Sequence, residues 1–191
     1  EFGFQSFPSF ETINYINQKN TISLKTAAIR SHQKHARGSN LIAEYMKRNY
    51  QIPIKDEDYV YVSQLLQAKG VVMGIEAHRR AKPNNMGTLY WQLNDCWPAI
   101  SWSSIDYFGN WKALQYKAKK AFENVLISTI LENNSVQTFV INDTFDPIQN
   151  VLKLKVVDFY GKEIWSDSKE IEVLENSSKS FYDFSLDSID K

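Results

Sequence analysis

The chain has 191 residues, 43% of them hydrophobic, which is enough apolar material for one large domain, or one and a half, with a buried core. Its 22 Lys and Arg residues balance its 22 Asp and Glu residues and are dispersed along the chain, which argues against a nucleic-acid-binding protein. The single cysteine, Cys96, excludes an internal disulfide, and no run approaches the ~20 apolar residues of a membrane-spanning helix.

The chain begins with the aromatic-rich segment Glu1-Phe-Gly-Phe-Gln-Ser-Phe-Pro. An acid followed by an aromatic residue and a glycine predicts the end of a strand where the backbone turns sharply, with Gly3 supplying the conformational freedom. From these residues alone, an exposed acid at an ordinary strand end is the simplest interpretation of Glu1.

Helical signals follow. Ser9 predicts the cap of a short helix with Ile13 and Ile16 on one face, and a second helical period begins at Leu41. The clearest helix covers residues 56–82, because acidic residues open it, basic residues close it and a proline follows. Two glycines inside it, Gly70 and Gly74, indicate close packing against another element.

The polar stretch 18–40 carries two histidines, His32 and His35, three positions apart. That spacing could place both rings on one helix face and bind a metal. No third ligand is nearby, so solvated loop histidines are favoured.

Residues 86–93 form a short apolar run without strict alternation, which predicts a strand buried on both faces. The run from Trp111 predicts an amphipathic helix packed through Trp111, Leu114, Tyr116, Ala118 and Phe122. The order strand end, helix, strand, helix favours a parallel α/β sheet or barrel, whose active sites lie at the carboxyl ends of strands. Glu1 and Trp91 both fall at such ends.

The composition changes near residue 124, and five runs of β-type residues follow at 126–131, 136–141, 151–159, 163–174 and 180–186. We expect residues 125–191 to form an all-β sandwich domain separate from residues 1–124. Five strands fall short of the ~7 strands of an immunoglobulin-type sandwich, so this domain is expected to be incomplete. The sequons at Asn133, Asn142 and Asn176 are typical of surface turns.

The stretch Gly87-Thr-Leu-Tyr-Trp-Gln-Leu-Asn-Asp-Cys-Trp-Pro-Ala-Ile-Ser-Trp holds three of the five tryptophans beside a polar run. Aromatic residues make up 14% of the chain, and exposed aromatic rings suit ligands with flat apolar faces, such as sugars. Together with Glu1-Phe-Gly-Phe-Gln-Ser-Phe-Pro-Ser-Phe and Gly109-Asn-Trp-Lys-Ala-Leu-Gln-Tyr, this stretch resembles the β-mannosidases of glycoside hydrolase family 2. The three blocks occur in the family's order and cover residues 1 to about 120.

The resemblance implies a retaining exo-enzyme that removes terminal, non-reducing β-D-mannose. The implied fold is α/β plus all-β: residues 1–124 form the C-terminal part of a catalytic (β/α)₈ TIM barrel, and residues 125–191 an immunoglobulin-like β-sandwich. Glu1 matches the family's catalytic nucleophile, and Trp91 matches a tryptophan that lines the mannose subsite. Asn94, Asp95 and Trp97 are further substrate-binding candidates, which either hold the loop or contact hydroxyl groups.

The family's acid/base glutamate lies in an Asn-Glu motif upstream of the nucleophile, whereas this chain begins at the nucleophile. We therefore expect the chain by itself to be inactive, because double displacement needs two carboxyl groups. The expected partners are a β-mannoside substrate and the remainder of the same polypeptide, with no nucleic acid and no membrane. No cofactor or metal is implied, and analogy favours a periplasmic or extracellular location.

Two other interpretations stay open. One is another family 2 activity, of the β-galactosidase or β-glucosaminidase type, because the family shares its nucleophile and barrel. The other is a non-catalytic carbohydrate-binding module in which Glu1 is incidental. An α/β fragment unrelated to sugars would leave three ordered motifs unexplained.

Overall fold

The computed structural model describes residues 1–189, which form two compact units. The first unit comprises residues 1–75 and 88–121, and the second comprises residues 76–87 and the chain from Phe122 onward. None of the helices in the described part of the chain combines the length and apolar character that a membrane span requires.

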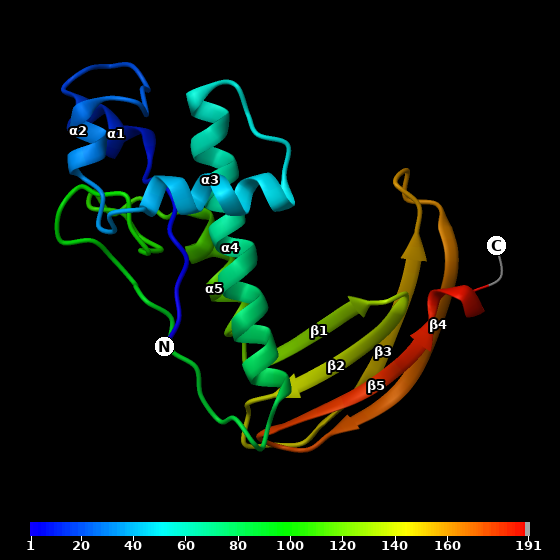
Figure 1. The fold of residues 1–191 in the computed structure, drawn as a ribbon. Helices are drawn as coiled ribbons and strands as arrows, with labels where there is room; N and C mark the ends of the chain where they lie inside the picture. The colour runs from blue at the N-terminus through cyan, green and yellow to red at the C-terminus, as the bar shows by residue number, and fades with distance from the viewer. Residues whose placement is uncertain (190–191) are drawn as a thin grey trace. The chain divides into compact units, whose positions relative to one another are not determined.

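The helices are α1 (Phe10–Asn17), α2 (Ala27–Ser31), α3 (Gly38–Asn49), α4 (Asp56–Arg80) and α5 (Ala113–Ala121) (Figure 1). The predicted Ser9 cap is confirmed, since Ser9 Oγ accepts a hydrogen bond from the Thr12 amide at 3.4 Å. Ile13 and Ile16 are buried as predicted. The long helix α4 also has its acidic first turn and basic last turn in the expected places. The short helix α2, capped by Thr26, was not predicted, because its polar surroundings hide any helical period.

Two predictions about packing in the first unit are wrong. Residues 86–93 form no regular strand: only Tyr90 pairs, through a single parallel bridge to Phe2. Leu89, Trp91 and Leu93 are half or more exposed, so the run is not buried on both faces. The packed side of α5 also differs from the prediction, because Leu114 and Ala118 are buried whereas Trp111, Tyr116 and Phe122 are largely exposed.

Two hydrophobic clusters hold the first unit together. One gathers residues of α1 to α4 with Phe7 and Ile100, and the other joins α4 to α5. Phe2, Phe4 and Tyr90 pack against the second cluster. The segments that carry Glu1 and Trp91 therefore rest on α4 and α5 through alternate side chains.

Both glycines of α4 pack closely against an aromatic ring, as the sequence predicted, but only Gly74 is required for the approach. A Cβ built on Gly74 would lie 2.5 Å from Cε2 of Phe2, and one on Gly70 would lie 3.4 Å from Cδ2 of Phe4. The aromatic rings thus rest directly on the helix backbone.

The second unit contains β1 (Val125–Glu132), β2 (Ser135–Asn142), β3 (Ile148–Val157), β4 (Glu163–Val173) and β5 (Ser177–Ser185), followed by a 3₁₀ turn at Leu186–Ser188. The five predicted strands are confirmed. They form an antiparallel sheet in the order β1-β2-β5 and a two-stranded sheet of β3 and β4. Asn133 and Asn134 join β1 to β2 with φ of 49° and 66°, which suits a tight two-residue hairpin turn. Both sheets contribute buried side chains to one hydrophobic core, which consists of Val140, Leu152, Ile171, Val173 and Tyr182.

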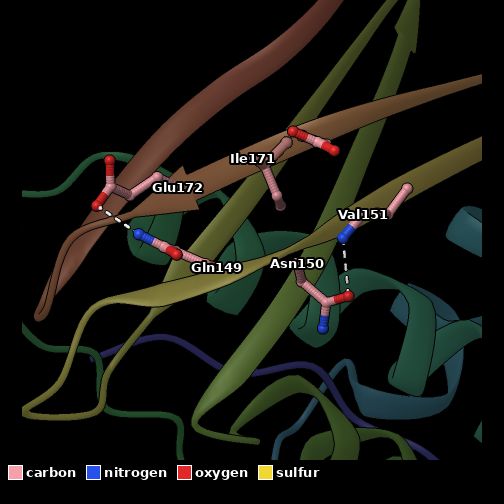
Figure 2. Close-up of a pocket in the computed structure, with 6 residues that line it drawn as sticks. Gln149, Asn150, Val151, Ile171 and Glu172 are labelled. Atoms are coloured by element: carbon pink, nitrogen blue, oxygen red, sulfur yellow. Dashed lines mark hydrogen bonds between the residues drawn. The ribbon is translucent and has the colours of Figure 1, made fainter.

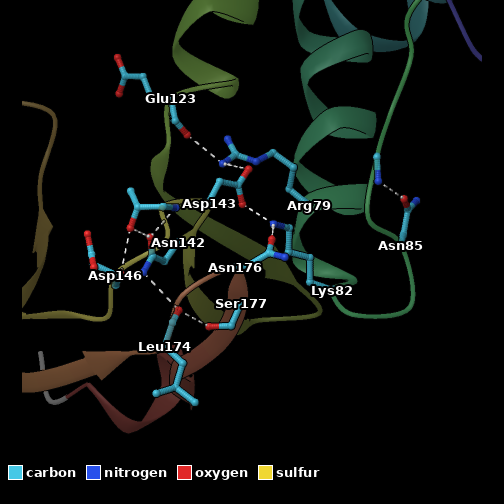
Figure 3. Close-up of polar contacts among 12 residues, drawn as sticks. Arg79, Lys82, Asn85, Glu123, Asn142, Asp143, Asp146, Leu174, Asn176 and Ser177 are labelled. Carbon is cyan, nitrogen blue, oxygen red and sulfur yellow. Dashed lines mark hydrogen bonds and ion pairs between the residues drawn. The ribbon is translucent and has the colours of Figure 1, made fainter.

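Cationic side chains of residues 76–87 bind to the rest of the second unit (Figure 3). Arg79 Nη2 donates to the Glu123 carbonyl at 2.8 Å and to Asp143 Oδ2 at 3.0 Å. Lys82 Nζ donates to Asp143 and, at 2.8 Å, to Asn176 Oδ1.

The three sequons do not share one environment. Asn133 and Asn176 are exposed turn residues, as expected. Asn142 is fully buried, and its Nδ2 donates to the carbonyls of Asp146 and Leu174 at 2.8 Å and 3.2 Å. The expectation of a surface turn is therefore wrong at Asn142, whose side chain links the end of β2 to the residue that follows β4.

Candidate functional site

A parallel bridge joins the two segments on which the sequence placed the main site residues. The Phe2 amide donates to the Leu89 carbonyl at 3.2 Å, and the Trp91 amide donates to the Phe2 carbonyl at 2.8 Å. Phe2 and Tyr90 pack toward the helices, unlike their chain neighbours Glu1 and Trp91. Both are open to solvent, with Trp91 50% exposed. The structure therefore brings the Glu1 and Trp91 segments together.

Gly3 fits this site for a reason other than the predicted one. Its φ lies outside the positive range, so it makes no sharp left-handed turn. A Cβ at this position would instead lie 2.4 Å from the Trp91 carbonyl oxygen and 3.0 Å from Cδ1 of Trp102. Glycine is needed because the aromatic loop passes directly over the backbone.

Asp95 stabilises the loop 91–102 through hydrogen bonds within it. It is 5% exposed, and its Oδ2 accepts hydrogen bonds from Ser101 Oγ at 2.7 Å and Ser103 Oγ at 2.6 Å. Asn94 is exposed, and its carbonyl accepts from Gln92 Nε2 at 2.7 Å. The peptide bond between Trp91 and Gln92 is cis. Of these two polar candidates, only the side chain of Asn94 is open to a ligand.

Trp97 lies against one of the histidines of the polar stretch. Its ring stacks on His32 with centroids 4.7 Å apart and planes inclined by 23°, and Lys34 Nζ lies 5.6 Å from the ring centroid. His32 Nδ1 lies 2.7 Å from the Pro98 carbonyl oxygen. The expectation of a solvated histidine is therefore wrong for His32, because the aromatic loop returns to this segment. Across the described residues, no group of three potential metal ligands occurs.

A buried polar network that was not predicted from the sequence lies beneath these segments. Gln67 of α4 is fully buried, and its Nε2 donates to the Phe4 carbonyl at 2.8 Å and the Trp102 carbonyl at 3.0 Å. Its Oε1 accepts from Ser6 Oγ at 2.8 Å, and Lys112 Nζ donates to the same Ser6 Oγ at 3.2 Å. One helix side chain therefore fixes the backbone of both site segments.

Lys112 is the largest fully buried side chain of the chain's described part. Burial lowers its pKa to about 8, and the charges of Asp95 and Asp106 oppose that shift only in part. No periodic signal could have revealed it, since Lys112 precedes the first residue of α5 and a lysine is ordinarily assigned to the polar side.

Asp106, like Lys112, is a buried charged residue that was not predicted from the sequence. Burial raises the pKa of its carboxyl group, but hydrogen bonds from Ser9, Thr12 and Asn110 outweigh burial and hold the pKa below its usual value. The Thr12 hydroxyl donates to Asp106 Oδ2 at 2.8 Å. This carboxylate thus ties the start of α1 to the turn that precedes Lys112.

A separate recess of about 500 Å³ lies over β3 and β4 (Figure 2). Gln149 Nε2 donates to Glu172 Oε1 across it at 3.3 Å. The recess is lined by Gln149, Asn150, Val151, Glu170, Ile171 and Glu172, without an aromatic ring. The segments that carry Glu1 and Trp91, in contrast, meet in the first unit.

Comparisons with known proteins identify relatives of this chain. The family profile of the Mannosidase Ig/CBM-like domain matches residues 134–191. The β-mannosidase of Rattus norvegicus is 32% identical over 139 residues, which cover 66% of this chain and 16% of the rat protein. The β-mannosidase of Mus musculus is 28% identical over 191 residues, covering 93% of this chain and 21% of the mouse protein.

Solved structures extend the likeness to the whole chain. The β-D-mannosidase of Dictyoglomus thermophilum matches 100% of this chain and 24% of its own, with a TM-score of 0.87 and 31% identity. An exo-chitosanase of Amycolatopsis orientalis matches 92% of this chain and 22% of its own, with a TM-score of 0.72, and at 22% identity it supports the fold alone. The chain spans only 16% to 21% of the lengths of the rat and mouse relatives. Sequence blocks, sandwich domain and overall likeness agree, and the chain belongs to the β-mannosidases of glycoside hydrolase family 2.

Proposed function

We propose that the protein carrying this chain is a retaining exo-β-mannosidase with Glu1 as its nucleophile. The observation that supports the proposal is the bridge between Phe2 and Tyr90, which joins the two segments that carry the exposed residues Glu1 and Trp91. The likeness to the β-D-mannosidase of Dictyoglomus thermophilum supports mannose as the sugar.

In this mechanism the Glu1 carboxylate attacks the anomeric carbon of a terminal β-mannoside. A second carboxyl group, which we assign upstream of Glu1 by resemblance to the family, protonates the leaving oxygen as the glycosidic bond breaks. The same group then removes a proton from water, which attacks the mannosyl ester and restores the free Glu1 carboxylate. Asn94 and Trp97 are candidate contacts because both are exposed, and Asp95 acts by holding the loop.

We further propose that residues 1–124 are the C-terminal part of a TIM barrel and that residues 125–191 are an immunoglobulin-like domain. The five strands that begin at Val125 and the family match to residues 134–191 support this boundary.

The substrate assignment is tested with the purified full-length protein on nitrophenyl β-mannoside, β-glucosaminide and β-galactoside. We expect the mannoside to be hydrolysed with the highest kcat/KM. A preference for the glucosaminide would favour the other candidate function, since the fold is also similar to that of an exo-β-D-glucosaminidase, with a TM-score of 0.76.

Residues 1–191 expressed alone should release no nitrophenol above a matched blank. A single nucleophile without its acid/base partner cannot complete double displacement. Release above the blank would show that both carboxyl groups lie within these residues and would move the acid/base assignment into the chain.

Replacing Trp91 with alanine in the full-length protein should raise KM and lower kcat. A stacked indole binds the sugar in both the ground state and the transition state, and its loss should lower kcat/KM about 10- to 100-fold. Trp111→Ala is the matched control, because Trp111 is 43% exposed and its ring contacts Tyr116. Unchanged kinetics in Trp91→Ala with a lowered Tm would assign Trp91 to the fold.

A further inference from the structure

Every hydrogen bond of the buried Gln67 carboxamide is made to a segment outside its own helix. Its Nε2 donates to the carbonyls of Phe4, Trp102 and Ser103 at 2.8, 3.0 and 3.2 Å. The two N–H bonds of the amide thus serve three acceptors, while its Oε1 accepts from the Ser6 hydroxyl at 2.8 Å. Both ends of the carboxamide are therefore engaged, and the side chain is fully buried.

Gln67 belongs to the helix face on which the segment after Glu1 rests. Gln67, Gly70 and Gly74 follow one another at spacings of three and four, which places them on one side of α4. The ring of Phe2 lies against Gly74 and that of Phe4 against Gly70. The segment therefore runs along this face, and Gln67 supplies the polar contact at its far end.

The loop that begins at Trp91 is bound to the same carboxamide. The Trp102 carbonyl that accepts from Gln67 also accepts from the Gln92 amide at 3.3 Å, and Gln92 directly follows Trp91. The segment that begins at Glu1 and the aromatic loop are thus held in register by one side chain.

Hydrogen bonds fix this register more sharply than the apolar contacts do. Burial of apolar surface is non-directional, so rings resting on a helix resist separation more than sliding. A hydrogen bond weakens steeply when its angle falls below about 120°, so the Gln67 bonds oppose movement of the segment along α4. This matters for chemistry because a shift of about 1 Å in a reacting group can lower a rate about 100-fold.

We propose that Gln67 is a positioning residue for β-mannoside hydrolysis, which places the Glu1 carboxylate for attack on the anomeric carbon without contacting the sugar. The inference rests on the proposed function, with Glu1 as nucleophile, and deepens it. Because Gln67 acts through the backbone of the segment after Glu1, its loss should slow the attack and leave sugar binding nearly unchanged.

The test uses the full-length protein and 2-deoxy-2-fluoro-β-D-mannosyl fluoride. The Glu1 carboxylate attacks the anomeric carbon and the anomeric fluoride leaves, while the fluorine at C2 slows hydrolysis of the ester, so the inactivation rate measures attack alone. Gln67→Met should lower this rate about 100-fold and keep the inhibition constant of D-mannose within about threefold. Gln67→Glu keeps the shape and the acceptor for Ser6 but loses the amide donor, and it gives the same readout should Gln67→Met fold poorly.

Gln64→Met is the matched control. Gln64 lies one turn earlier on α4, where its Nε2 donates to the Phe7 carbonyl and its Oε1 accepts from the Ala113 amide, both at 3.2 Å. Its loss should lower the Tm as the loss of Gln67 does, but keep the inactivation rate within about twofold.

A second comparison separates the position of Glu1 from other effects of Gln67. In Glu1→Ala, azide attacks dinitrophenyl β-mannoside in place of the carboxylate and dinitrophenolate leaves, so adding Gln67→Met should change this rate by less than about threefold. Equal losses with and without Glu1, or an unchanged inactivation rate in Gln67→Met, would overturn the positioning role and leave the mannosidase proposal in place. A full-length protein that neither hydrolyses the mannoside nor reacts with the fluoride would instead overturn the proposed function.

Discussion

Replacement of Glu1 with alanine in the full-length protein should lower kcat for β-mannosides by about 10³-fold or more, because the covalent intermediate no longer forms. The Tm should stay unchanged, since Glu1 is exposed and lies outside the buried network of Gln67 and Lys112. Steady-state kinetics with nitrophenyl β-mannoside and a thermal melt measure both quantities.

Sodium azide sharpens this test. With the carboxylate removed, the azide anion can attack the anomeric carbon from the side of Glu1, nitrophenolate leaves, and the product is α-mannosyl azide. Glu11→Ala, which removes an exposed acid of the same unit, should keep parental turnover. Near-parental turnover in Glu1→Ala, or a β-mannosyl azide product, would rule out Glu1 as the nucleophile.

Because Lys112 is buried, we expect the free energy of unfolding to rise with pH above about pH 8. In the folded protein its ammonium group loses its proton near pH 8, whereas the unfolded chain keeps it up to about 10.5. Between these values the unfolded state binds more protons, so the free energy of unfolding rises with pH. One proton gives a slope of at most about 1.4 kcal/mol per pH unit, or a total gain of about 3 kcal/mol.

Lys112→Met should abolish this rise, because methionine has similar length and no charge. The measurement is the difference in free energy of unfolding between wild type and variant at several pH values from 7 to about 10 in urea. Lys119→Met, on the exposed part of α5, is the control and should retain the rise. A constant difference between wild type and Lys112→Met would show that the buried lysine keeps its ordinary pKa.

Features governed by local chemistry could be predicted from the sequence. The Ser9 cap and the charge pattern of α4 depend on residues within one or two turns, and the Asn133-Asn134 turn follows from residues that tolerate positive φ. The five strands of the second unit alternate strongly enough to be found by their period of two.

Features that depend on distant residues could not be predicted. His32 was expected in solvent, yet it stacks on a tryptophan 65 positions later in the chain. The run 86–93 was expected to be a full strand, but the chain supplies a pairing partner only at Phe2. Lys112 is buried by elements far apart in sequence, among them the segment at Ser6, and the local pattern around it is that of a surface residue.

The candidate site was predicted in part. Glu1 and Trp91 came from resemblance and from their positions at strand ends, and the structure adds how their segments are joined. Asp95 was a candidate for substrate contact, but its burial and two serine donors make it a structural residue. The Gln67 network involves side chains whose roles appear only when three segments meet.

The two glycines of α4 have a consequence for how Glu1 is positioned. Each glycine in a helix interior costs about 1 kcal/mol relative to alanine, so the pair weakens the helix by about 2 kcal/mol. In return the ring of Phe2 sinks onto the helix backbone at Gly74, and the residue that precedes Phe2 is Glu1. The position of the Glu1 backbone is therefore fixed through its neighbour Phe2 by a glycine of α4, and the helix gives up part of its own stability for this contact.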